Sequence, residues 1–90
     1  MTERMRILVK GAVQGVYYRY STLKKAEEYH LTGWVRNRVD GSVEIVCEGT
    51  KENINNLVQW CKKGPEGAHV SEVETEWEEY TGEFNVFEIR

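Results

Sequence analysis

The sequence predicts a two-layer α+β sandwich, in which two helices cover one face of an antiparallel sheet. Three observations support this fold class. Strand-like and helix-like patterns follow one another in the order β-α-β-β-α-β, with a further short strand at the end. The dipeptide Asp40-Gly41 separates the two central strands, as in a tight hairpin. The length of 90 residues fits one domain over residues 1–90.

The first half contains two strand-like segments around one helical segment. Residues 5–12, MRILVKGA, are rich in β-formers and roughly alternate, which predicts a strand. After a loop over residues 11–18, we expect a helix from about Ser21, its N-cap, to about His30. The apolar stripe of this helix comprises Leu23, Ala26 and Tyr29 or His30. The next strand begins at Thr32-Gly33 and ends near Arg38.

The second half repeats the order of strand, helix and strand. Residues 42–49, SVEIVCEG, predict the third strand, and Thr50 is suited to cap a helix with Glu52 in its first turn. The apolar stripe of this helix comprises Ile54, Leu57, Val58 and Cys61. The helix ends at KKGP, residues 62–65.

Two strands complete the chain. Residues 68–78 predict a strand in which Val73, Thr75 and Trp77 alternate, and residues 84–90, FNVFEIR, predict a short last strand. Two β-α-β units around a central hairpin make the ferredoxin-like arrangement. That fold alone does not identify a function.

The net charge of −3 conceals an asymmetry along the chain. Residues 1–38 carry eight Lys/Arg against three Glu, whereas residues 39–90 carry four Lys/Arg against twelve Asp/Glu. One interpretation is two solvated faces of opposite sign, and the other is a site for a small anion in the first half. A long nucleic acid is disfavoured, because the acidic second half would repel it.

Composition and cysteine content favour a soluble, cytoplasmic protein. No apolar run approaches the roughly 20 residues of a membrane helix, and the N-terminus lacks the apolar segment of a signal peptide. Cys47 and Cys61 lack metal-ligand spacing. We expect both to be reduced, buried thiols, and a strand-to-helix disulfide is the alternative.

The stretch GAVQGVYYRY, residues 11–20, carries the candidate site. Its glycines allow a loop whose successive N–H groups point inward at a helix N-terminus, which is a cradle for an anion. Arg19 would add planar, bidentate recognition of phosphate. Asn37, near the end of the second strand, could hold a water in line with a phosphorus atom. The alternatives are an ordinary turn at the glycines and a turn-favouring Asn at a strand end.

These residues resemble a known family. VQGVYYR, residues 13–19, is similar to the acylphosphatase signature, and GWVRN with DGSVE, residues 33–37 and 40–44, resembles the second block of that family. KKGP and the closing FEIR resemble its later segments. The resemblance spans nearly the whole chain and implies the same ferredoxin-like sandwich.

The resemblance also implies an activity and a site. The activity is hydrolysis of the carboxyl–phosphate bond of acyl phosphates, with Arg19 as the catalytic arginine and Asn37 as the residue that orients the water. The phosphate-binding residues, acting through backbone N–H groups, are Gln14, Gly15, Val16, Tyr17, Tyr18 and Arg19. We expect a monomer that needs no metal or cofactor. Its ligands should be a small acyl phosphate as substrate and inorganic phosphate or sulfate as a product-like ligand. We expect it to bind neither nucleic acid nor membrane.

The aromatic residues before Arg19 depart from many family members, which have Gly and Phe there. We expect Tyr17 and Tyr18 to serve structural packing, although Tyr17 and Tyr18 leave open which acyl groups enter the site. His30 and His69 are expected to be structural or surface residues.

Two other functions share this topology. One is a non-enzymatic anion-binding module, which the combination of Arg19 with Asn37 disfavours. The other is an RNA-binding domain, but the first and third strands, RILVKG and SVEIVCEG, lack the aromatic residues that stack on bases.

Overall fold

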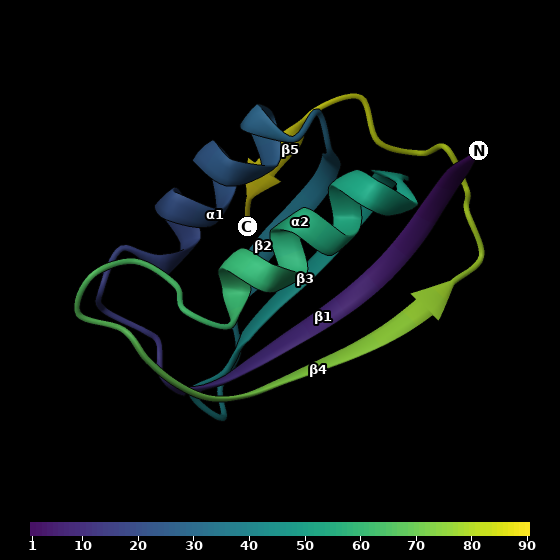
Figure 1. Ribbon diagram of the computed structural model, residues 1–90. Coiled ribbons are helices and arrows are strands. Elements are labelled where there is room, and N and C mark those ends of the chain that lie inside the picture. The colour runs from purple at the N-terminus through teal and green to yellow at the C-terminus, as the bar shows by residue number, and fades with distance from the viewer.

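The structure is a computed structural model that describes residues 1–90, and it has the predicted ferredoxin-like fold (Figure 1). In chain order the elements are β1 (Thr2–Ala12), α1 (Tyr18–Glu28), β2 (Thr32–Asn37), β3 (Val43–Thr50), α2 (Lys51–Cys61), β4 (His69–Glu78) and β5 (Phe87–Ile89). The strand order in the sheet is β4-β1-β3-β2-β5. Both helices cover the same face, and neither is long and apolar enough to cross a membrane.

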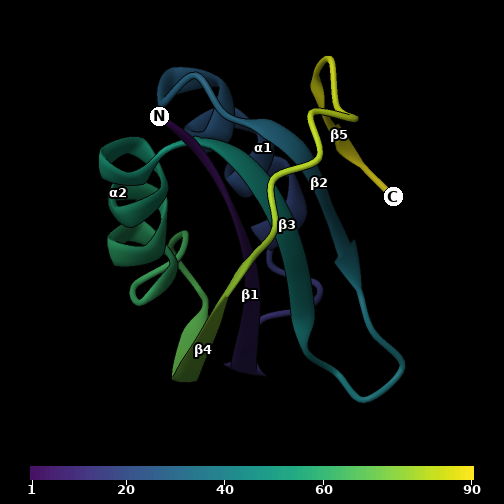
Figure 2. The ribbon, with the colours of Figure 1, turned by 90° about the vertical axis from the view of Figure 1, so that its right-hand side faces the viewer.

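The pairing of the last strand differs from the expected antiparallel sheet. β5 pairs parallel with β2, so the sheet is mixed rather than antiparallel throughout. The reason is the direction of the chain. After β4, the chain crosses to the opposite edge of the sheet and turns back (Figure 2). It therefore runs opposite to β4 and in the same direction as β2.

Helix α1 differs from its expected start. It begins at Tyr18, and its N-cap Tyr17 has a left-handed backbone (φ 61°, ψ 25°) with no side-chain cap. Ser21 is therefore not the N-cap, because its N–H already bonds the Tyr17 carbonyl at 3.0 Å. The buried stripe is Tyr18, Thr22 and Ala26. Of the expected stripe, Ala26 is confirmed, Leu23 and Tyr29 are only partly buried, and His30 is exposed.

Helix α2 confirms its predicted start and its apolar stripe. The Thr50 hydroxyl accepts a hydrogen bond from the Asn53 N–H at 3.1 Å, and Glu52 lies in the first turn. Ile54, Leu57, Val58 and Cys61 are all buried. Both cysteines are free thiols, as expected, and burial raises the pKa of Cys61 to about 12, so this thiol is protonated at neutral pH.

The core lies between the helices and one face of the sheet. Met5, Ile7 and Val9 alternate along β1 and are buried beneath the helices. The register pairs these residues with Trp77, Thr75 and Val73 of β4, respectively. The predicted alternation of β4 therefore faces the helices, but β4 is an edge strand and Trp77 stays substantially exposed.

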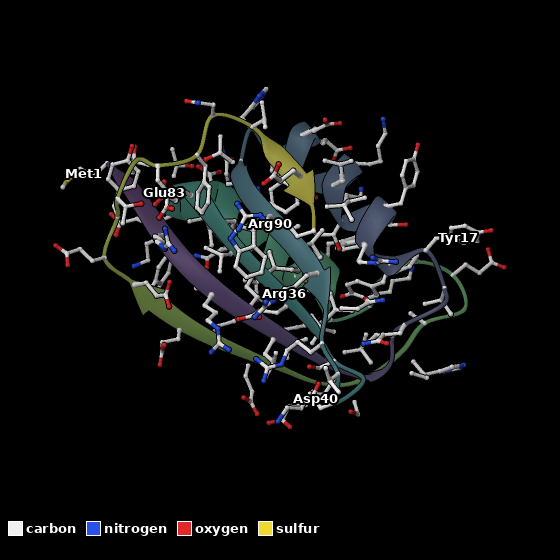
Figure 3. All side chains as sticks on the ribbon, turned by 180° about the vertical axis from the view of Figure 1, so that it is seen from behind. Met1, Tyr17, Arg36, Asp40, Glu83 and Arg90 are labelled. Atoms are coloured by element: carbon white, nitrogen blue, oxygen red, sulfur yellow. The ribbon has the colours of Figure 1, made fainter.

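The face of the sheet opposite the helices carries ion pairs between the two halves of the chain. Arg4 pairs with Glu48, Glu78 and Glu83, at 3.4, 3.0 and 2.7 Å. Lys10 pairs with Glu74 at 2.8 Å, and Arg38 pairs with Asp40 at 3.6 Å. Figure 3 views this face, where Arg36 and Arg90 are labelled. The interpretation as two faces of opposite sign is wrong, because β1 pairs with β3 and β4 and so interleaves basic and acidic side chains.

Glu44 and Glu48 are the two buried carboxylates of this network, and Glu44 is the one that two arginines hold directly. It is 4% exposed and accepts hydrogen bonds from Arg6 at 2.6 Å and Arg36 at 2.7 Å. Burial alone would raise the pKa of Glu44, but the two guanidinium groups outweigh it and hold the pKa below its ordinary value. The stabilisation is therefore fully present above the unfolded-state pKa and is lost as the pH falls through the folded-state pKa.

We expect Glu44→Gln to lower the free energy of unfolding at pH 7 by about 1–3 kcal/mol, because two charge-assisted hydrogen bonds weaken. At pH 3, below the ordinary pKa of a glutamate in the unfolded chain, the difference from the parent should shrink, because the unfolded chain then binds a proton that the folded carboxylate resists. Urea unfolding at the two pH values measures this, with the exposed and unpaired Glu66→Gln as the control. An equal loss at both pH values would contradict the electrostatic explanation.

Candidate active site

The topology brings the two motif segments to the same end of the sheet. β1 and β2 both run antiparallel to β3, so their C-terminal ends lie at the same end of the sheet. The loop of residues 13–17 follows β1, and Asn37 is the last residue of β2. Figure 1 shows the β1–α1 loop beside the β2–β3 turn.

The Gln14 side chain joins these two segments directly. Its Nε2 donates to the carbonyl oxygens of Arg38 at 2.8 Å and Ser42 at 2.9 Å, on the two sides of the β2–β3 turn. The turn itself is held by the Asp40 carboxylate, which accepts from the Ser42 N–H at 3.0 Å. The Gln14 amide thus fixes the loop next to Asn37. The sequence motif indicates a role for the backbone N–H of Gln14, but it does not indicate what the Gln14 side chain binds.

The loop leaves its backbone donors free. None of the N–H groups of residues 13–17 donates a hydrogen bond within the chain. Gly15 (φ 76°) and Tyr17 (φ 61°) have positive φ, a backbone geometry that can turn neighbouring N–H groups to one side. The first turn of α1 adds N–H groups that have no intrahelical acceptor. Together these donors lie at the positive end of the helix dipole, which suits an anion.

Arg19 is exceptional among the basic residues of the first half. It is exposed in the first turn of α1 and makes no ion pair or side-chain hydrogen bond. Every other arginine of the chain pairs with a carboxylate. Its guanidinium is therefore available for an external anion, whereas the others are already neutralised.

Helix geometry places Arg19 on the flank of α1 that faces away from α2. Tyr18, Thr22 and Ala26 face the core. Ser21 and Lys25 share a groove of about 280 Å³ with Trp60 of α2, so their flank faces α2. At 100° per residue, Arg19 projects from the opposite flank.

Asn37 lies on the same side of the sheet. It follows the buried Val35 by two residues, so strand alternation places it on the helix-covered face. Its amide makes no hydrogen bond within the chain, and it lines a hollow of about 400 Å³ at the β2–β3 turn with its neighbours Arg36, Arg38, Val39 and Asp40. The free carboxamide and the free backbone donors therefore lie at the same end of the fold, where the helix that carries Arg19 begins. The hollow beside Asn37 is lined by neither Arg19 nor the loop residues.

The two tyrosines before Arg19 have different environments. Tyr18 is 2% exposed, and its hydroxyl donates to the Cys61 carbonyl at 2.7 Å, so its structural packing is confirmed. Burial raises the pKa of this phenol far above its usual value. The same expectation is wrong for Tyr17, which is 82% exposed and projects from the loop (Figure 3). Its left-handed backbone turns the side chain away from the core that its successor enters.

The remaining titratable candidates lie apart from this arrangement. His30 and His69 are both exposed, as expected for surface residues. Cys47 and Cys61 are buried in the core. No group of three or more His, Cys, Asp or Glu side chains is arranged to hold a metal ion.

Comparison with known proteins gives one consistent result. The family model Acylphosphatase matches residues 5–89. An acylphosphatase of Pelotomaculum thermopropionicum is 51% identical over 86 residues, which cover 96% of this chain and 94% of the relative. The structure of an acylphosphatase from Coxiella burnetii superposes with a TM-score of 0.94 at 40% identity, covering 99% of this chain and 93% of that one. The acylphosphatase from Bacillus subtilis also gives 0.94, at 34% identity, covering 100% and 99%.

Proposed function

The chain belongs to the acylphosphatase family of hydrolases, and we propose that it cleaves acyl phosphates without a metal ion, using Arg19, the loop amides and Asn37. The products are a carboxylate and inorganic phosphate. The observation that carries the assignment is that Arg19 is the one arginine without a carboxylate partner, beside a loop of unused backbone donors.

The phosphoryl group binds in the loop. The N–H groups of residues 14–19 hold its oxygens, and the Arg19 guanidinium binds two of them in a bidentate contact. During transfer, negative charge spreads over the equatorial oxygens. Donors that are fixed before the substrate arrives stabilise this charge without reorganisation, which is a large contribution to the rate.

Asn37 places the attacking water. Its carboxamide both accepts and donates hydrogen bonds, so it can hold one water in line with the bond that breaks. The oxygen of this water forms a new bond to phosphorus, while the bond from phosphorus to the carboxylate oxygen breaks. The carboxylate leaves with the electron pair, and a proton of the water passes to a phosphoryl oxygen. A carboxylate is a weakly basic leaving group, so the mechanism needs no protein acid or base.

The same proposal covers the working form of the protein. The chain acts as a monomer in one domain over residues 1–90, in the cytoplasm. Inorganic phosphate, or sulfate as its analogue, binds the loop as a product-like competitive inhibitor. Binding of these ions is the property that a non-enzymatic anion-binding module would share.

Hydrolysis of benzoyl phosphate in the presence of EDTA tests the proposal. We expect phosphate release at the same rate with and without EDTA, because guanidinium and amide donors supply the positive charge. Loss of activity with EDTA, restored by Mg²⁺, would contradict metal independence. Phosphate binding without any turnover would favour the anion-binding module.

A further inference from the structure

We propose that the Tyr18 hydroxyl positions the anion-binding loop, because it ties the first residue of α1 to the C-terminal end of α2 and thereby fixes Arg19. This inference rests on the proposed function and deepens it. The hydroxyl acts through its neighbours and does not touch the substrate, so Tyr18 is a positioning residue through its side chain.

The contact that carries this inference joins two helix ends. The hydroxyl of Tyr18 donates at 2.7 Å to the carbonyl of Cys61, which lies 43 residues away at the end of α2. The last carbonyls of a helix have no intrahelical donor, and a buried phenol also needs a partner. One hydrogen bond satisfies both buried groups.

The tyrosine ring is held on two further sides. Its centroid lies 5.3 Å from that of Trp60, with the rings tilted by 50°. On another side is Gly64 (φ 70°), where an added Cβ would lie 2.6 Å from the Cε2 atom of Tyr18. The ring therefore fills the space that a side chain at position 64 would need, and it packs directly against the turn after α2.

The start of α1 lacks the side-chain cap that usually fixes a helix N-terminus. A side-chain cap normally accepts from the first N–H groups of a helix, as Thr50 does for α2. Here the N-cap is Tyr17, which provides no such bond. A cap would occupy the donors that the phosphoryl group requires. The anchor instead comes from the buried side of the helix and leaves the amides free.

This anchor also holds an unfavourable backbone in place. Tyr17 has a left-handed backbone (φ 61°), a conformation that is unfavourable for a non-glycine residue. Tyr18 follows it directly and precedes Arg19. When the hydroxyl is lost, we expect this segment to sample more conformations, so that amides and guanidinium converge less often on one anion.

Tyr18→Phe tests the inference, since it keeps the ring and removes only the hydroxyl. We expect the dissociation constant of inorganic phosphate, measured by calorimetry, to rise about two- to tenfold, which corresponds to one net hydrogen bond. The KM for benzoyl phosphate should rise with it. The matched control is Ile45→Val, a core change in β3 of similar expected stability loss, which should leave phosphate affinity unchanged.

Each outcome decides the matter. Unchanged phosphate affinity in Tyr18→Phe, or an equal loss in Ile45→Val, would overturn the positioning role. Failure of the proposed function is recognised separately, as absence of turnover by the parent, because phosphate binding is measured without the reaction. A parent that binds no phosphate would overturn both.

Discussion

Arg19→Ala should lower kcat/KM for benzoyl phosphate by at least about 10³-fold, because the variant loses both charge-assisted hydrogen bonds and stabilisation of the transferring phosphoryl group. Affinity for inorganic phosphate should fall below detection in calorimetry. The free energy of unfolding should stay within about 0.5 kcal/mol of the parent, since the side chain is exposed and unpaired. An intact fold with no activity is the combination that identifies a functional residue.

Two control variants sharpen this test. Lys24→Ala removes an exposed positive charge from the same helix and should keep most of the activity, which separates a specific contact from the general field of the protein. Arg19→Lys keeps the charge but loses the planar pair of donors, so an intermediate rate is expected. Parental turnover by Arg19→Ala would remove the main support for the proposed mechanism.

Much of the fold could be predicted because local signals agree with the global arrangement. In α2 the Thr50 cap, the buried stripe and the glycine after the last turn all indicate the same helix, and the structure has it. The Asp40-Gly41 turn likewise places β2 beside β3. Local signals do not predict the parallel pairing of the last strand, since this pairing depends on where the chain returns to the sheet.

Two differences from the expectation lie at the site, namely the start of α1 and the exposure of Tyr17. A side chain that can cap a helix is the usual sign of its start and indicates Ser21, whereas α1 begins at Tyr18 without a cap. A helix that offers its first N–H groups to a ligand has to leave them unpaired. The Tyr18 hydroxyl donates its hydrogen bond to the Cys61 carbonyl at the end of α2, a contact between distant segments that no local pattern indicates.

The sequence alone also does not predict which basic side chains form ion pairs with which carboxylates. Composition marked an excess of basic residues in the first half, and two interpretations were open. Only the strand order shows that Arg4 and Arg6 face carboxylates on the neighbouring strands. This pairing singles out Arg19, because an arginine without a partner can be recognised only after the partners of the others are known.

Asn37→Ala should separate the two parts of the mechanism. We expect kcat for benzoyl phosphate to fall about 10²-fold, because the attacking water is no longer held in line. The dissociation constant of inorganic phosphate should stay within about twofold of the parent, since the proposed mechanism assigns phosphoryl binding to Arg19 and the loop amides. Steady-state kinetics with calorimetry on the same preparation measures both.

The charge of the replacement distinguishes water orientation from phosphate binding at this position. Asn37→Asp keeps the shape of the side chain but adds a negative charge beside the bound anion, so both turnover and phosphate affinity should fall. Asn37→Ala should lower turnover alone. If Asn37→Ala instead weakens phosphate binding as much as Arg19→Ala does, Asn37 binds the anion and the attacking water is held by other groups.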